Sequence, residues 1–215
     1  MPLIHDEITP ELKRLLEIEK FGKLCVHIGI QSSVDGEIFT IARVHEYGAT
    51  IHAKKAKNLA IPISKKSKGK SPRDFPGLFF IEVDSGLVYG VVGKGKKKNG
   101  GTDNLEFLFI LLKSVNIPER SFIRACYDKN KEKIAEIMER HFEEVRNGKA
   151  TAEKAWDSIG AECVELTRRF FNDATNFKPK GNIARAVNPS YADNPLVVTG
   201  RLFNSITYEV TNIDE

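Results

Sequence analysis

The alternation of apolar and polar positions predicts strands in the first half of the chain. Residues Lys23–Ile30, KLCVHIGI, carry an apolar side chain at every second position, which is the strand period. Apolar runs bounded by turn residues predict further strands at Thr50–Ala53, Asn58–Ser64, Gly77–Asp84, Gly86–Gly93 and Leu105–Ile117. The turn Asp84–Gly86 joins two of these runs into a predicted hairpin.

Two helices are predicted among these strands. In the first, Thr9 caps a helix whose first residue is Pro10 and in which three leucines share a face. Gly22 is expected to end that helix. The run Ile38–Gly48 is ambiguous, but its apolar spacing favours a helix that stops at the glycine.

The apolar period changes to that of a helix in the second half. One stripe comprises Ile134, Ile137, Met138, His141, Phe142 and Val145. Thr151 caps a second helix, whose stripe comprises Ala152, Ala155, Trp156, Ile159, Cys163, Leu166 and Phe170. A short turn at Asn147–Gly148 joins the two helices, so we expect an antiparallel pair.

These elements predict an α+β fold in a single domain over residues 1–215. A mostly antiparallel sheet from about 23–117 packs against the helix pair at about 121–177. A short helical turn and a strand follow at about 195–212.

Composition narrows the class of protein. The 215 residues are 41% apolar and 29% charged, and the net charge is +4. That charge is too small to argue for nucleic-acid binding alone. The three cysteines, Cys25, Cys126 and Cys163, form no C-x-x-C pair and are expected to be reduced. The chain starts without a signal-peptide pattern, and its apolar runs are too short to span a bilayer, so we expect a soluble protein with no membrane partner.

No motif predicts catalysis, a metal or a cofactor. Ser64–Ser71, SKKSKGKS, ends like a phosphate-binding loop, but Ser64 stands where that loop needs a glycine, and prolines follow. His45 begins HEYGA, which lacks the second histidine of a zinc motif. His141 and Glu144 lie three apart, but the histidine is on the apolar stripe. We therefore expect no catalytic residue, no cofactor and no metal ligand, and a protein that is not an enzyme.

Basic clusters are the remaining polar feature. They comprise Lys54, Lys55 and Lys57; then Lys65, Lys66, Lys68, Lys70 and Arg73; and then Lys94, Lys96, Lys97 and Lys98. All three lie between predicted strands and could converge at one sheet edge, where they would contact phosphates without reading sequence. The alternative is that they provide solubility and protect the edge of the sheet.

Three passages resemble the virion morphogenesis proteins of tailed bacteriophages, which include the Mu-type proteins and related tail-completion and neck proteins. RVHEYGATIHAKKAKNLAIPIS (Arg43–Ser64) is similar to their helix-EYG-strand-LAIP passage. SVNIPERSFIRACYDKNKEKI (Ser114–Ile134) is similar to their I-P-x-R-x-F passage. NPLVVTGRLFNSITYEV (Asn194–Val210) is similar to their C-terminal P-L-x-D-T-G-R-L-R-x-S-I-x-Y element. The three passages cover about half of the chain in the family order.

The resemblance implies a structural protein of a phage or prophage particle, located in the virion and in the host cytoplasm during assembly. It would form a ring of identical subunits at the head–tail neck or the tail end. Its partners would be itself, neighbouring neck, connector, tail-tube or sheath proteins, and DNA passing through the lumen. The lysines from Lys65 to Lys98 would face that DNA. A stand-alone nucleic-acid-binding module that uses the same lysines is the alternative.

The C-terminal passage is the suspected interface with a neighbouring subunit. It comprises Thr199, Gly200, Arg201, Leu202, Phe203 and Ile206. Thr199 is expected to cap the short helical turn, Gly200 to permit it, and Leu202 and Ile206 to point inward. The chain departs from the family pattern at two positions, with Val198 in place of aspartate and Phe203 in place of arginine. A compatible alternative is that this element only closes the core of its own subunit.

Overall fold

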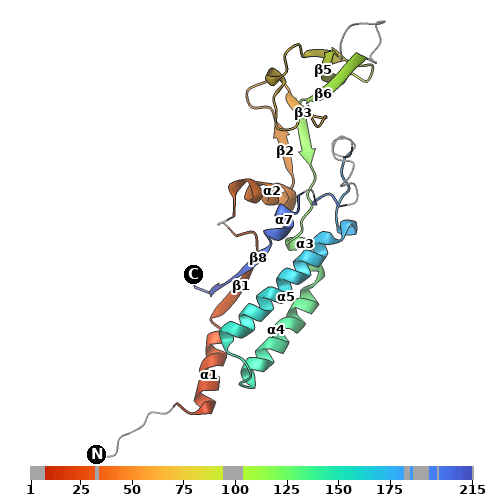
Figure 1. The fold of residues 1–215 in the computed structure, drawn as a ribbon. Coiled ribbons are helices and arrows are strands. Elements are labelled where there is room, and N and C mark those ends of the chain that lie inside the picture. The colour runs from red at the N-terminus through yellow and green to blue at the C-terminus, as the bar shows by residue number, and fades with distance from the viewer. Residues whose placement is uncertain are drawn as a thin grey trace, which may run out of the picture. The chain divides into compact units, whose positions relative to one another are not determined.

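The computed structural model describes residues 8–31, 34–93, 104–181, 185, 194–197 and 199–214, and its contacts divide the chain into two compact units (Figure 1). The helical unit comprises Met1–Tyr47, Arg120–Phe177 and Leu196–Glu215. The sheet unit comprises Gly48–Glu119 and Lys178–Pro195. The α+β class is confirmed. The single domain stays a prediction, because two compact units can still unfold in one cooperative transition.

The helical unit begins with α1 (Pro10–Phe21), whose start and end are as predicted. The Thr9 hydroxyl accepts a hydrogen bond from the backbone N–H of Leu12 at 3.2 Å, and Gly22 follows the last turn. The predicted helix near residue 40 is also confirmed as α2 (Gly36–Tyr47).

Two helices lie side by side in the helical unit, as the apolar stripes predicted (Figure 1). They are α4 (Lys131–Arg146) and α5 (Ala152–Asn172). The turn between them contains Gly148, which has a φ of +69°. The segment before α4 forms a separate short helix, α3 (Arg124–Lys129).

A two-stranded antiparallel sheet packs against α5. It pairs β1 (Leu24–Gly29) with β8 (Thr207–Asn212). The ring of Tyr208 lies directly over Gly160 of α5, where any Cβ atom would collide with it. The Tyr208 hydroxyl donates to Asp157 at 2.7 Å, so this tyrosine fixes β8 on the helix.

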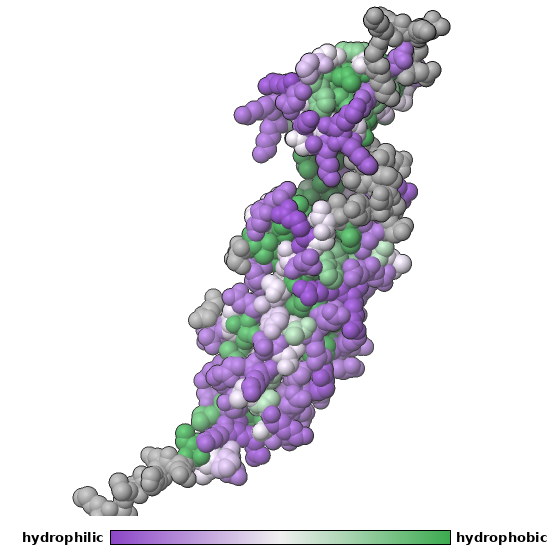
Figure 2. All heavy atoms as spheres, in the orientation of Figure 1, coloured by the Kyte–Doolittle hydropathy of each residue, from purple (hydrophilic) through white to green (hydrophobic). Residues whose placement is uncertain are grey.

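The core of the helical unit lies between these strands and helices. Its fully buried side chains include Phe122, Phe171, Ile159, Val145 and Ile206. Figure 2 shows hydrophilic residues over much of the visible face of this unit.

The sheet unit contains two antiparallel sheets. The larger has the order β3 (Leu59–Pro62), β6 (Leu105–Leu112), β5 (Val88–Gly93) and β4 (Phe79–Glu82). The smaller pairs β2 (Ala49–His52) with β7 (Ser114–Ile117). The predicted hairpin is confirmed as β4 and β5, and its turn contains Gly86 with a φ of +73°.

Two details differ from the sequence predictions. The run Leu105–Ile117 was expected to be one strand, but it divides at Lys113 into β6 and β7, which belong to different sheets. The strand predicted at Lys23–Ile30 was grouped with the other strands, but as β1 it belongs to the helical unit. The strands that pack against α5 are therefore β1 and β8.

Short helical turns complete the fold. They are the 3₁₀ helices η1 (Pro72–Asp74) and η3 (Ala174–Asn176) and the single turn α7 (Arg201–Asn204).

Candidate functional site

Glu46, near the end of α2, is a buried carboxylate that binds the start of α3. The residue is only 5% exposed. Its Oε2 atom accepts hydrogen bonds from the backbone N–H groups of Phe122 at 2.8 Å and Ile123 at 3.1 Å. Its Oε1 atom accepts from the Ser121 hydroxyl at 2.6 Å and from the backbone N–H of Arg124 at 3.0 Å. The carboxylate thus pairs N–H groups that a helix start leaves without partners.

The side chain of Arg124 holds the same carboxylate from a second direction. Its Nε atom donates to Glu46 Oε1 at 3.1 Å, and a terminal nitrogen donates to the Glu46 backbone carbonyl at 2.6 Å. The guanidinium lies over the ring of Tyr47, 4.4 Å from its centre. Glu46 and Tyr47 of the EYG motif therefore bind the segment that contains the P-E-R-S-F-I-R sequence.

The glycine of the EYG motif is also required by the structure. Gly48 has a φ of +71°, which favours glycine. A Cβ atom there would lie 2.9 Å from the backbone nitrogen of Glu119 and 3.1 Å from the carbonyl oxygen of Ile117. The backbone of Gly48 approaches these atoms too closely for any side chain.

The C-terminal element forms a tight turn, as predicted, with Gly200 at a φ of +75°. Gly200 itself occupies the N-cap position of α7, where Thr199 had been expected. The Thr199 hydroxyl accepts from the Arg201 N–H at 3.4 Å, a long hydrogen bond. The Arg201 guanidinium donates to carboxylates of Asp35 at 2.7 Å and Glu37 at 3.0 Å.

The suspected interface residues divide into buried and exposed ones. Leu202 and Ile206 are 6% and 0% exposed, because both pack in the core of their own unit. Phe203 is half-buried, and its ring lies against that of Phe171. Thr199 and Arg201 are exposed. An interface at this element stays a prediction, and Val198 lies outside the described residues.

The described lysines of the first two basic clusters are exposed on the sheet unit. Lys66 is ion-paired with Glu106 at 2.9 Å, and the ammonium of Lys70 lies over the Phe75 ring. Buried Ser67 fixes their loop, since its hydroxyl donates to the Leu108 carbonyl at 2.6 Å. The lysines of the third cluster, Lys94, Lys96, Lys97 and Lys98, lie outside the described residues.

An apolar groove of about 650 Å³ lies within the sheet unit, between β3, η1 and β4. Lys57 and Arg73 are among the residues that line it, and its apolar residues are Ala56, Ala60, Phe75, Leu78, Phe80 and Leu111. Phe80 is 52% exposed although it is aromatic. Phe75 and Phe80 follow the first two basic clusters along the chain, and the folded sheet places them beside Lys57 and Arg73.

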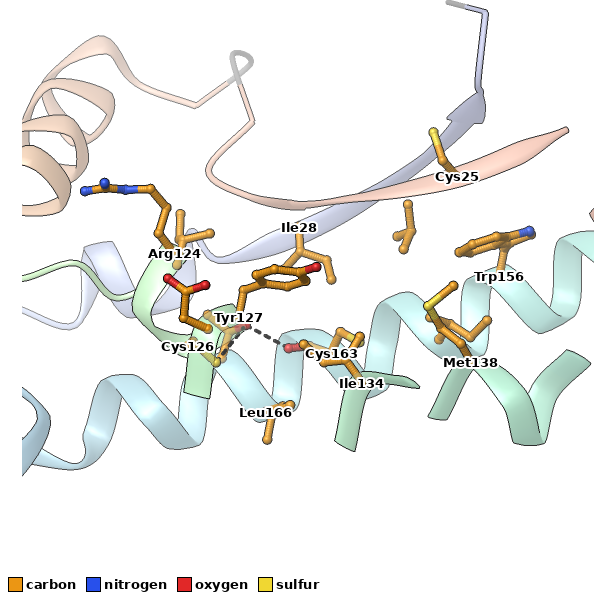
Figure 3. Close-up of a pocket in the computed structure, with 15 residues that line it drawn as sticks. Cys25, Ile28, Arg124, Cys126, Tyr127, Ile134, Met138, Trp156, Cys163 and Leu166 are labelled. Carbon is orange, nitrogen blue, oxygen red and sulfur yellow. Dashed lines mark hydrogen bonds between the residues drawn. The ribbon is translucent and has the colours of Figure 1, made fainter. Parts of the chain in front are cut away.

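A second cavity, of about 670 Å³, lies in the helical unit between β1 and helices α3, α4 and α5 (Figure 3). Its walls are mainly apolar, and the thiols of Cys126 and Cys163 lie beside it. Burial raises the pKa of Cys163 to about 11 and also raises the pKa of Cys126. Both thiols therefore stay protonated at neutral pH, the form that is a poor nucleophile.

His141 is a buried histidine held by two carboxylates. Its Nδ1 atom lies 2.9 Å from Glu144, and its Nε2 atom lies 2.9 Å from Glu162. Arg140 also binds Glu162, at 2.6 Å. Hydrogen bonds from His141 and Arg140 of α4 to Glu162 of α5 therefore link the two helices.

The described part of the chain holds no group of three histidine, cysteine or acidic residues placed to bind a metal ion. Within the same residues, every helix is too short or too polar to cross a membrane. Comparisons with protein-family models, curated proteins and solved structures found no match.

Proposed function

We propose that this chain is a non-enzymatic structural protein of a tailed-phage or prophage particle. It acts as one subunit of a ring at the neck or the head-proximal end of the tail, where it completes the particle. The single observation that supports this proposal most is the position of Glu46. The carboxylate of the EYG passage binds the backbone of the I-P-x-R-x-F passage, so two of the three passages that resemble the phage family meet in one place.

The chemistry of the family-like residues also supports a structural role. The side chains of Glu46 and Arg124 form hydrogen bonds with each other and with backbone groups. Arg201 binds the carboxylates of Asp35 and Glu37 within its own unit. These contacts hold the start of α3 and the turn before α7, which lie inside the family-like passages.

Deletion of the gene from its producing strain tests the proposal. After induction, the lysate is imaged by negative-stain electron microscopy. Filled heads lying apart from tails, or tails of irregular length, are the expected result, and the wild-type gene on a plasmid restores normal particles. Normal, infectious particles from the deletion strain would refute a structural role.

A second candidate is nucleic-acid binding, which the charge of the sheet unit favours. This unit carries sixteen Lys and Arg against seven Asp and Glu, a net charge of +9. The helical unit carries seventeen against twenty-two, a net charge of −5. Binding through phosphates would weaken steeply as salt rises, by one counterion for each contact. An absence of DNA binding at low salt would rule this candidate out.

A further inference from the structure

Helix α1 presents an exposed apolar stripe. Ile8, Leu12, Leu15 and Leu16 are 48%, 46%, 60% and 47% exposed. The three leucines lie within α1 at i, i+3 and i+4, which places them on one face of the helix, and Ile8 lies just before the N-cap residue Thr9. This is the spacing with which amphipathic helices bind apolar grooves. The other side of α1 packs on α4 and α5, so the stripe points away from its own unit.

The groove of the sheet unit is an apolar recess with cations among its lining residues. Its floor includes Leu78, Leu111 and the half-exposed ring of Phe80. Lys57 and Arg73 are exposed, and among the described residues neither forms an ion pair. An exposed aromatic within an apolar recess is typical of a binding hot spot.

The apolar floor distinguishes between two kinds of occupant. A surface built for phosphates alone needs cations and gains nothing from an exposed phenylalanine ring above partly buried leucine side chains. An amphipathic helix with an acidic side chain beside its apolar stripe uses both features. In α1, Glu11 is next to Leu12, is exposed, and among the described residues forms no ion pair.

We propose that α1 of one copy docks in this groove of a second copy. Leu12, Leu15 and Leu16 cover Phe80 and Leu111, and Glu11 faces Lys57 and Arg73. The opposite net charges of the two units, −5 and +9, favour the approach of the helical unit of one copy to the sheet unit of another. Such a contact joins two different surfaces, and a head-to-tail contact of this kind can close into a ring. The inference thus deepens, and rests on, the proposed function as a ring subunit.

Disulfide cross-linking tests the contact in the full chain. The variant combines Leu15→Cys with Phe80→Cys in a Cys25→Ser background, since Cys25 is the one native cysteine of the three that is not buried. Mild oxidation should give a ladder of covalent dimers and larger species on a non-reducing gel. Two control pairs each keep one of these cysteines. The first combines Leu15→Cys with Phe79→Cys, which lies on the opposite face of β4. The second combines Phe80→Cys with Ile213→Cys. Leu15 and Ile213 are equally exposed, at 60%.

A ladder confined to the test pair supports the proposal. A cross-link within one chain, equal ladders in the controls, or no ladder would overturn it. Sedimentation equilibrium of uncross-linked protein gives a second readout: Leu15→Asp should weaken self-association by about tenfold or more, while Ile213→Asp leaves it unchanged. Equal effects of the two variants, or no effect of either, would overturn the proposal. It would also be overturned if Lys57 and Arg73 were needed for binding DNA but not for self-association.

The two proposals can fail separately. A specific ladder together with normal particles from the deletion strain would keep the contact and refute the phage role. Defective particles without a ladder would keep the phage role and refute this contact.

Discussion

The sequence shows the EYG motif, but it does not show what the side chain of Glu46 binds. The letters EYG were recognisable, but nothing in them indicates that the carboxylate caps α3, about 75 residues later in the chain. Only the folded backbone brings the N–H groups of Phe122, Ile123 and Arg124 to the side chain. The buried carboxylate contributes more to stability than a single hydrogen bond does, because it accepts several hydrogen bonds at once.

Replacing Glu46 by glutamine should destabilise the protein by about 1–3 kcal/mol. The amide keeps the shape but loses the charge, and its NH₂ group cannot accept hydrogen bonds. Chemical denaturation measures the change, with Glu139→Gln on the exposed side of α4 as the control. Equal unfolding free energies for the two variants would contradict the role given to Glu46.

Glu162 should make stability depend on pH. Hydrogen bonds from Arg140 and then His141 lower its pKa below the ordinary 4.5. Its contribution is therefore fully present above pH 4.5 and is lost as the pH falls through the lowered value. Thermal unfolding of Glu162→Gln should show a Tm below the wild-type Tm at pH 7, and a smaller difference at pH 3. A difference that stays constant across this range would show that the charge of Glu162 does not contribute.

At the scale of elements, neighbouring residues in the sequence predicted where helices and hairpins begin, turn and end. The capping threonine of α1, the glycine after α2 and the turn of the β4–β5 hairpin are each fixed by neighbours in sequence. The change of sheet at Lys113 gave no such signal, because apolar positions continue on both sides of it. The sequence also did not predict the apolar groove of the sheet unit, because that groove depends on which strands pair.

Gly48 and Gly69 offer a matched pair for testing the EYG turn. Both have positive φ angles, +71° and +74°, but a Cβ atom at Gly69 would meet nothing within 4 Å. Gly69→Ala should therefore cost only the strain of the left-handed conformation, about 1–2 kcal/mol. Gly48→Ala adds a collision with Glu119 and should cost more, by about 1–3 kcal/mol. Similar unfolding free energies for both variants would show that the close approach at Gly48 is not a constraint.

At the scale of the whole molecule, the two units carry opposite net charges, and the net charge of the whole chain does not show this. A net charge of +4 gave little information, because +9 on one unit is offset by −5 on the other. The unit boundaries depend on the strands that pair at residues 49–52 and 114–117, which the sequence did not reveal. Opposite charges on one chain favour contacts between copies, in agreement with a role in assembly.

The central claim is that this chain is a component of a phage particle. The most direct measurement is to purify particles from the induced producing strain on a density gradient and to quantify the chain in them by mass spectrometry. We predict a fixed number of copies per particle, in constant ratio to the other structural proteins across the particle band. A chain that is abundant in the lysate but absent from purified particles would contradict the account.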